Sequence, residues 1–248
     1  MKVSIITVSY NSEETIRETI ASVLFQDYPK IEYIIVDGGS KDRTMKIVSE
    51  YEERIYKIIS ESDKGIYDAM NKGINFSSGE VVGLLNSDDV YSNRSVISEV
   101  VRYLSQGNVD AVFADLEIVS KKLLTRRRRL YSSKRFRPYK FRWGWMPAHP
   151  TFFVKKICYK KFGLYRTDLN IAADFELLVR FLYRNQVSYV YIPRCLVTMR
   201  GGGASASGLW GVLFQNIEIV RACRENGIYT NIFLVALKIP VKIFEYFR

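Results

Sequence analysis

Strand-type and helix-type segments alternate along the first 115 residues, and this alternation constrains the fold more than any other feature. Apolar runs that predict strands cover residues 3–9, 31–36, 56–60, 81–85 and 111–114. Helical patterns separate them, at residues 12–24, 40–51, 66–76 and 95–104. Strands that alternate with helices of this length form a mostly parallel sheet covered by helices on both faces. The sequence therefore predicts an α/β fold.

The second half of the chain follows a looser pattern. It predicts strands at residues 151–154 and 187–191 and a helix at 174–183. A glycine-rich loop at residues 200–205 then precedes a long helical region that runs almost to Arg248. No internal repeat is visible.

Composition limits the compartment and the class of partner. The chain of 248 residues is 48% hydrophobic, which is ample for a packed core. Its three cysteines are dispersed and form no zinc spacing, which favours a reducing compartment. We expect no signal peptide and no membrane span, and hence a cytoplasmic protein. The net charge of +11 favours nucleotide phosphates, nucleic acid or anionic lipid as the partner.

Two adjacent carboxylates, Asp88 and Asp89, directly follow the predicted strand 81–85. Ligands bind outside the carboxyl ends of the strands in an open α/β sheet, and paired carboxylates there need a compensating cation. Mg²⁺ or Mn²⁺ carrying a phosphate would supply that compensation. The alternative is a solvated turn with two surface aspartates.

Other polar residues follow the neighbouring strands and are expected at the same edge. Tyr10 offers a stacking face, and Asp37 is placed to accept a hydrogen bond from a base or ribose. The remaining members of the set are Thr7 near the end of the first strand and Asp63 and Lys64 after the third. Taken singly, each of these residues could simply belong to an ordinary turn. The chain lacks the glycine motifs of P-loop ATPases and dinucleotide-binding enzymes, so those classes are disfavoured.

Three of these segments together resemble the inverting glycosyltransferases of family 2. They are Val3–Asn11, Ile34–Thr44 and Asn86–Asp89, in the order and spacing of that family. The resemblance implies a GT-A fold, a nucleotide-sugar donor and a divalent cation. The stretch Asp63–Gly73 is similar to one found in members that build bacterial surface polysaccharides.

The resemblance also implies roles for individual residues on the donor side. Asp37 would accept the imide N–H of a uracil-type base, and Asp89 would bind the metal directly with Asp88 nearer the ribose or sugar. The residues expected to bind the nucleotide sugar are Thr7, Tyr10, Asp37, Asp63, Lys64, Asp88 and Arg200. Arg200 and the glycines after it would form a closing lid over the diphosphate. The alternative is that this segment is a plain hinge before the last helices.

The catalytic base is expected at Asp174. The family usually carries a Glu-Asp-x-x-Leu motif at a helix start, and the matching segment here has Ala173 in place of the glutamate. A first-turn acid that stabilises the helix is the alternative for Asp174.

Glu176 is the next candidate on the acceptor side. His149, the only histidine, is a further acceptor-side candidate, because similar segments in relatives lie there, although a lone histidine is often structural.

Residues 126–142 carry many arginines and lysines among aromatic side chains, and three interpretations stay open. They are a nucleic-acid contact, a solvated loop and a patch on an anionic membrane surface. We favour the membrane patch, because residues 231–248 predict a helix with a cationic stripe and an otherwise apolar surface. Packing of that helix on the catalytic domain is the alternative.

The combined prediction is a GT-A catalytic domain at residues 1–205 with a C-terminal helical extension at 206–248. Residues 1–115 would bind the nucleotide sugar and residues 116–205 the acceptor. The enzyme would transfer one sugar, from a UDP-sugar in preference to others, to a glycan or lipid-linked glycan at the inner membrane face. We expect no nucleic-acid partner; a basic nucleic-acid-binding protein and a catalytically silent nucleotide-sugar binder are the alternatives.

Overall fold

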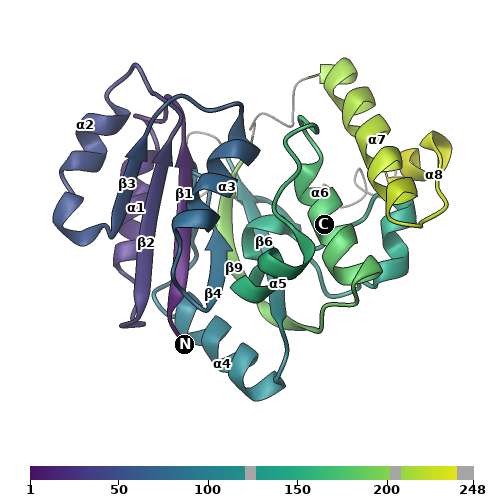
Figure 1. Ribbon diagram of the computed structural model, residues 1–248, viewed down its shortest axis with the longest axis horizontal. Helices are drawn as coiled ribbons and strands as arrows, with labels where there is room; N and C mark the ends of the chain where they lie inside the picture. Colours follow the sequence, from purple (N-terminus) through teal and green to yellow (C-terminus); the bar gives the residue numbers. More distant parts are fainter. Residues whose placement is uncertain (121–126, 202–207, 239–248) are drawn as a thin grey trace.

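The computed structural model describes residues 1–120, 127–201 and 208–238. Within them a single twisted sheet of nine strands forms the centre, with helices on both faces (Figure 1). The strand order is β3-β2-β1-β4-β8-β6-β9-β5, and β7 pairs with β6 outside this path. The α/β prediction is confirmed.

The first four strands form a parallel unit. They are β1 (Val3–Ser9), β2 (Ile31–Asp37), β3 (Lys57–Ser60) and β4 (Val81–Leu84). The helices between them are α1 (Ile16–Leu24), α2 (Thr44–Ser49) and α3 (Ile66–Phe76), and a 3₁₀ turn, η1 (Glu52–Arg54), precedes β3. The register aligns the last residues of β1, β2 and β3, so that Ser9, Asp37 and Ser60 lie in one row. We refer to this side of the sheet as the carboxyl edge.

The second half of the sheet is mixed in direction. Its strands are β5 (Asp89–Tyr91), β6 (Ala111–Val119), β7 (Arg127–Tyr131), β8 (Phe153–Lys155) and β9 (Tyr189–Arg200). β8 runs antiparallel to both β4 and β6, whereas β9 runs parallel to β6. The contact between β4 and β8 depends on Gly83, because a Cβ there would collide with the ring of Phe153.

Two hydrophobic clusters cover the two faces of the sheet. One includes residues of α1, α2 and α4 (Val96–Gly107). The other includes residues of α3, α5 (Lys156–Phe162), α6 (Ala173–Leu178) and α7 (Gly208–Glu225). Shorter elements are η2 (Pro138–Trp143), η3 (His149–Thr151), the π-helical turn η4 (Val179–Arg184) and α8 (Ile232–Ala236).

The basic segment at residues 126–142 is more ordered than a solvated loop. Part of it forms β7 and part forms η2. Arg129 is buried, and the rings of Phe136 and Phe141 belong to the core beside α6. The loop interpretation is therefore wrong for the described part, because apolar and aromatic side chains between the cations pack inward.

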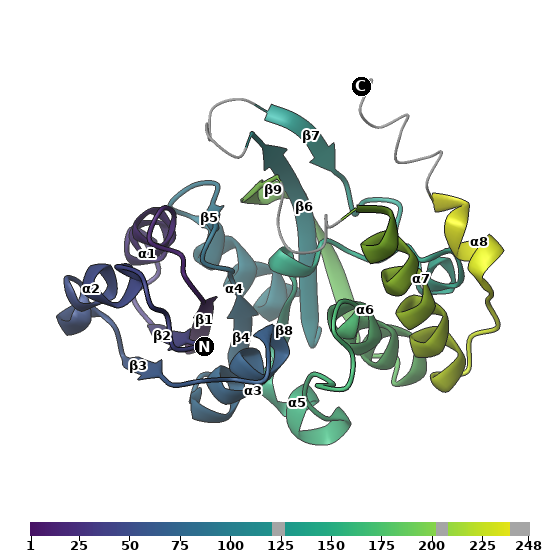
Figure 2. The same ribbon diagram turned by 90° about the horizontal axis from the view of Figure 1, so that it is seen from above.

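The C-terminal helical region divides into two helices, α7 and α8, which lie side by side in both views (Figures 1 and 2). Asn231 begins α8, and its side chain accepts a hydrogen bond from the backbone of Leu234. The predicted continuation to residue 248 lies outside the described residues beyond Lys238, as does the glycine-rich loop at 202–207. Among the helices of the described ranges, none is both long and apolar enough to cross a bilayer.

Candidate active site

Asp37 joins three strand ends at the carboxyl edge. Its carboxylate accepts five hydrogen bonds, from the hydroxyls of Ser9, Ser60 and Ser40 and from the N–H groups of Gly39 and Ser40. The side chain is fully buried. Because protein donors already occupy both oxygens, Asp37 shapes the loop after β2 in this structure, and its predicted contact with a base imide stays a prediction.

Thr7 and Tyr10 differ in what they present. The Thr7 side chain is fully buried, and its hydroxyl accepts a hydrogen bond from Tyr33 at 3.1 Å. Thr7 therefore does not line a ligand site through its side chain, because alternation along β1 points it into the core. Tyr10, three residues later on the loop after β1, is 64% exposed and leaves its ring free to stack. Asn11 holds this loop, since its amide oxygen accepts a hydrogen bond from the N–H of Lys41 at 2.9 Å.

Asp63 lies against the loop that Asp37 organises. A Cβ added at Gly38 would come within 2.5 Å of Asp63 Oδ2, so only glycine permits this approach. Asp63 Oδ1 accepts a hydrogen bond from the N–H of Gly65 at 2.8 Å. Lys64, between them, has an exposed side chain. The structure thus brings Asp63 and Lys64 to the carboxyl edge, as predicted from their place after β3.

Asp89 is the most perturbed carboxylate at this edge. It is fully buried at the start of β5, and its Oδ1 has no hydrogen-bond partner. Its other oxygen accepts a long hydrogen bond, 3.4 Å, from the amide of Asn86, and the backbone of Arg200 also interacts with the carboxyl group. Burial, and then the neighbouring charge of Asp88, raise the pKa of Asp89 well above its ordinary value. A buried carboxylate in this state favours a nearby cation.

Arg200 is the nearest described cation along the β5–β9 ladder. Asp89 pairs with Met199, so Arg200 follows directly, and its charge opposes the rise in the pKa of Asp89. The Arg200 side chain is buried and forms an ion pair with Glu18 of α1. In this structure it is held against α1, and its predicted contact with a diphosphate stays a prediction.

The residues around Asp89 fit a divalent cation that is bound together with a phosphate ligand. The unpartnered Oδ1 of Asp89 is a hard oxygen donor of the kind that Mg²⁺ and Mn²⁺ prefer. The described part of the chain holds no group of three or more His, Cys, Asp or Glu side chains placed to bind a metal ion. Substrate phosphates and water commonly complete the coordination of Mg²⁺ beside one or two protein carboxylates.

A second group of polar residues surrounds Asp174 in the first turn of α6. Asp174 Oδ1 accepts a hydrogen bond from the N–H of Phe175 at 2.7 Å. Burial raises the pKa of Asp174, and the interaction with His149 opposes this rise. Burial lowers the pKa of His149, so this imidazole is neutral near pH 7. A carboxylate with a raised pKa beside a neutral histidine suits a general base.

Two tyrosines connect this group to α3. His149 Nε2 lies 2.7 Å from the hydroxyl of Tyr165, whose ring stacks on that of Tyr67 with centroids 5.9 Å apart. Tyr67 in turn donates a hydrogen bond to the carbonyl of Ile171 at 2.7 Å, three residues before Asp174. Tyr67 and Tyr165 were not among the predicted site residues, although Tyr67 falls inside the stretch 63–73 that resembles the family.

The topology brings both groups to the same edge of the sheet. β8 is antiparallel to β4 and pairs Phe153 with Gly83, so η3 with His149 lies beyond the carboxyl end of β4. Asp88 follows that same end. Tyr67 lies in the first turn of α3, which follows the carboxyl end of β3. The carboxyl edge therefore carries both the candidate metal ligand and the candidate base.

Glu176 is buried in an ion pair with Arg180, and its predicted place on the acceptor side stays a prediction. Its two oxygens accept hydrogen bonds from the guanidinium of Arg180, at 2.9–3.2 Å, and the side chain is buried. Asn226 donates a further hydrogen bond to it at 3.2 Å. Two positions along a helix from Asp174, Glu176 points to a different side and pairs there with Arg180. In this structure the Glu176 carboxylate therefore contributes to the packing of α6.

Glu218 of α7 is a site residue that sequence reasoning missed. Its carboxylate accepts hydrogen bonds from the backbone N–H groups of Asn170, Ile171 and Ala172, at 2.8–2.9 Å. These amides lead directly into α6 and Asp174. The local sequence carries no signal of this contact, because 46–48 residues separate the partners.

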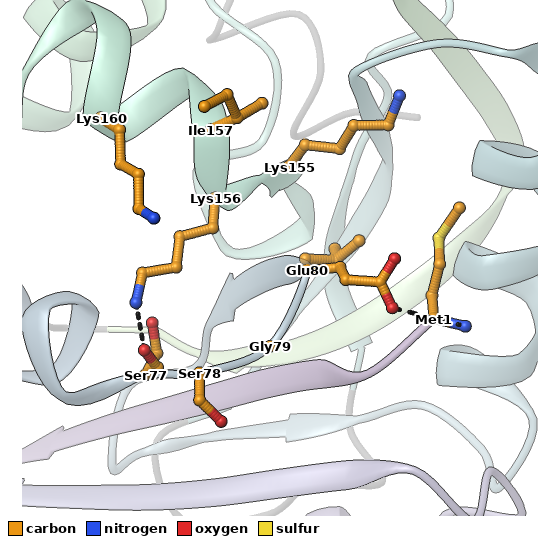
Figure 3. Close-up of a pocket in the computed structure, with 10 residues that line it drawn as sticks. Met1, Ser77, Ser78, Gly79, Glu80, Lys155, Lys156, Ile157 and Lys160 are labelled. Atoms are coloured by element: carbon orange, nitrogen blue, oxygen red, sulfur yellow. Dashed lines mark hydrogen bonds and ion pairs between the residues drawn. The ribbon is translucent and has the colours of Figure 1, made fainter.

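A cavity of about 530 Å³ lies at the opposite edge of the sheet, near the first residues of β1 and β4 (Figure 3). Lysines line it, but Lys156 donates to the carbonyl of Ser77 and Lys155 pairs with Asp110. The terminal amino group pairs with Glu80 across its floor. Because the cavity lies at the opposite edge of the sheet from the carboxyl edge, we do not assign it a role in catalysis.

Sequence comparison identifies the family. A family model described as glycosyl transferase family 2 matches residues 4–167. An uncharacterised glycosyltransferase of Mycobacterium tuberculosis is 33% identical over 187 residues, which cover 72% of this chain and 68% of that protein. The Escherichia coli glucosyltransferase WfgD is 33% identical over 119 residues, 48% of this chain and 47% of its own length.

Solved structures confirm the fold. Staphylococcus aureus TarS, residues 1–349, in complex with UDP-GlcNAc superposes with a TM-score of 0.67 at 18% identity, covering 96% of this chain and 72% of that one. The mannosyltransferase PcManGT of Pyrobaculum calidifontis, in complex with GDP-Man and Mn²⁺, gives 0.67 at 19% identity, covering 90% and 63%. The architecture is of the GT-A type. With the family model spanning most of the sheet and both carboxylate groups at its carboxyl edge, the chain belongs to glycosyltransferase family 2.

Proposed function

We propose that this enzyme transfers one sugar from a UDP-sugar to a hydroxyl of a lipid-linked glycan, with inversion at the anomeric carbon, in polysaccharide biosynthesis. The observation that carries the proposal is the buried Asp89, with one oxygen unpartnered, at the same sheet edge as the candidate base Asp174. The two carboxylates correspond to the two requirements of the reaction, a cation at the diphosphate and a base at the acceptor.

On the donor side, Tyr10 stacks on the base, and Asp63, Lys64 and Asp88 contact the ribose, diphosphate or sugar. Asp89 holds Mn²⁺ or Mg²⁺, which supplies Lewis-acid stabilisation of the diphosphate that leaves. Asp37 keeps the loop after β2 in shape through its five internal hydrogen bonds. Arg200 contributes positive charge near the diphosphate when it is released from Glu18.

On the acceptor side, Asp174 removes the proton from the acceptor hydroxyl as that oxygen attacks the anomeric carbon. The bond from the anomeric carbon to the diphosphate oxygen breaks with both electrons on the nucleotide diphosphate, and the configuration inverts. His149 stays neutral, and its hydrogen bond with Tyr165 places it beside the base. We also propose a catalytic domain at residues 1–205 and a C-terminal extension at residues 206–248. Within the catalytic domain, residues 1–115 would bind the nucleotide sugar and residues 116–205 the acceptor.

The relatives support the choice of substrates. WfgD is named a glucosyltransferase from UDP-Glc to a GlcNAc-diphosphoundecaprenol. TuaG of Bacillus subtilis, 43% identical over 90 residues, which are 35% of this chain and 36% of TuaG, is named a putative teichuronic acid biosynthesis glycosyltransferase. TarS is described with UDP-GlcNAc, whereas PcManGT is described with GDP-Man and Mn²⁺. A lipid-linked acceptor resides in the membrane, so we propose that the enzyme works at its cytoplasmic face as a peripheral protein.

A thermal-shift screen of UDP-, dTDP- and GDP-sugars with and without Mn²⁺ tests the donor. A ligand that binds the folded state stabilises it according to its affinity and concentration, so UDP-sugars should raise the melting temperature most, and only with Mn²⁺. The preferred donor is then incubated with a GlcNAc-diphosphate-lipid, and the product is measured by mass spectrometry. Stabilisation by a GDP-sugar alone would overturn the UDP assignment, and transfer that persists in excess EDTA would overturn the metal assignment.

A further inference from the structure

Helix α7 is apolar on two opposite sides. Its inner side, which includes Ile219 and Cys223, belongs to the core cluster that also contains Phe175 of α6. Its outer side leaves Trp210 74% exposed and Phe214 58% exposed. A surface helix ordinarily places polar residues outward, whereas a helix that is apolar all round is normally covered by something. The outer side of α7 therefore needs a partner.

The exposed residues form one stripe along α7. Trp210, Leu213, Phe214 and Ile217 are all exposed and follow the spacing that places residues on one face of a helix. At the same spacing, Arg221 and Arg224 continue the stripe, and both are exposed. Arg221 pairs with Asp168 and Glu225, and Arg224 donates a hydrogen bond to the carbonyl of Thr230. Helix α8, which packs beside α7, adds exposed Phe233 and Leu237. We call Trp210, Leu213, Phe214 and Ile217 the α7 outer face.

We propose that the α7 outer face docks on an anionic lipid surface. Aromatic and aliphatic side chains that insert at the head-group level, with arginines on the same helix face, are the features of a helix that lies in a membrane interface. Tryptophan in particular favours this boundary. The net charge of +11 is complementary to anionic head groups. A second copy of this chain would meet the same positive charge, which opposes that pairing.

A residue next to the α7 outer face contacts the segment that precedes the candidate base. Glu218 follows Ile217 on α7 and accepts the three backbone hydrogen bonds from residues 170–172. Docking of α7 would therefore fix the orientation of the first turn of α6, with Asp174, relative to the bilayer. This would present the base to an acceptor whose lipid anchor remains in the bilayer. The consequence for catalysis rests on the proposed function, whereas lipid binding itself does not.

Vesicle co-sedimentation of the full chain, without donor or acceptor, tests the proposal. Vesicles of phosphatidylglycerol mixed with phosphatidylcholine should bind the protein, and vesicles of phosphatidylcholine alone should bind it much less. Replacing Trp210 and Phe214 together by serine should lower the partition coefficient by at least about tenfold, because two large apolar side chains no longer insert. Raising the salt to about 0.5 M should also release the protein, because the arginine contribution is screened.

Phe25→Ser is the matched control. Phe25 is 73% exposed just after α1, and its replacement should leave vesicle binding unchanged. Helix α1 lies at the opposite end of the molecule from α7 in both views (Figures 1 and 2). Circular dichroism checks the fold, and Trp210→Ser alone serves if the double variant is unstable. Equal binding of the double variant and the control would overturn the proposal. So would a dimer in light scattering that the double variant converts to monomer, because the face would then belong to a second copy.

Discussion

The carboxylate of Glu218 accepts a hydrogen bond from the backbone N–H of Ala172 at 2.8 Å, and Ala172 lies two residues before Asp174. Glu218 thereby caps the amides that would otherwise lack a partner at the start of α6. The first residues of α6 have no side-chain cap of their own. A residue on α7 thus positions the candidate base on α6.

Replacing Glu218 by alanine should lower kcat by roughly tenfold to a hundredfold, because a small displacement of a catalytic group has effects of this size. Donor affinity, measured by calorimetry, should stay at the wild-type value. Glu218→Gln keeps one acceptor oxygen and should restore part of the rate. Glu225→Gln, on the same helix in an exposed ion pair, is the control and should leave kcat unchanged. Loss of donor binding in Glu218→Ala would contradict a positioning role.

Asp174→Asn should reduce transfer by about 10²–10⁴-fold, the usual contribution of a positioned general base. Nucleotide-sugar affinity should change little, because the base contacts the acceptor hydroxyl. Steady-state kinetics together with calorimetry of UDP-sugar binding measure both quantities. Near wild-type transfer by this variant would place the base elsewhere.

The pH dependence of the rate provides an independent test of Asp174. Burial raises the pKa of this carboxyl above the ordinary aspartate value, and only the ionised form accepts a proton. The rate should therefore fall as the pH drops through the raised pKa, and the midpoint should lie above that of an exposed aspartate. A rate that stays constant down to pH values near 4 would contradict the assignment.

Asp89→Asn should stabilise the metal-free protein near pH 7 while abolishing Mn²⁺-dependent donor binding. Because the folded state raises the pKa of Asp89, this group lowers stability as the pH rises above the ordinary aspartate pKa, and the loss is complete above the raised pKa. Below the ordinary pKa the group is protonated in both states, so the difference should vanish there. Differential scanning fluorimetry at several pH values measures this, and a gain of 1 kcal/mol corresponds to roughly 2–4 °C. A lower melting temperature of the variant than of the wild-type protein at pH 7 would show that other groups in the folded protein already stabilise the ionised form of Asp89.

Glu176 and Arg180 should matter for stability and not for the chemical step. Removing one partner of a buried ion pair typically costs about 3–5 kcal/mol, so Arg180→Ala should markedly lower the urea midpoint of unfolding. Arg180 also donates to the carbonyls of Gly163 and Leu164, at 2.9 and 2.7 Å, so the loop after α5 loosens too. The fraction that stays folded should keep the wild-type pH profile. A shifted pH profile in Glu176→Gln would place this residue on the acceptor side.

The parallel half of the sheet and the positions that follow each strand could be predicted from local patterns in the sequence. Apolar strand runs and short polar connections are local features, so β1 to β4 and the helices between them could be predicted with small boundary errors. The carboxylate pair at Asp88 and Asp89 and the candidate base Asp174 were also recognisable, because each follows or begins a predicted element. β6 and β9 extend beyond their predicted ends, since pairing between them continues where the apolar pattern stops.

The directions and contacts of the other polar side chains depend on packing between elements that are far apart in the sequence. Thr7 turns into the core toward Tyr33, and Glu176 pairs with Arg180, although both sit beside residues that do reach the carboxyl edge. Glu218 joins α7 to the amides before Asp174 across a separation that no local pattern encodes. The outward side of α7 was likewise decided by packing, because a helix that is apolar on two sides carries no sequence signal for which side faces the core.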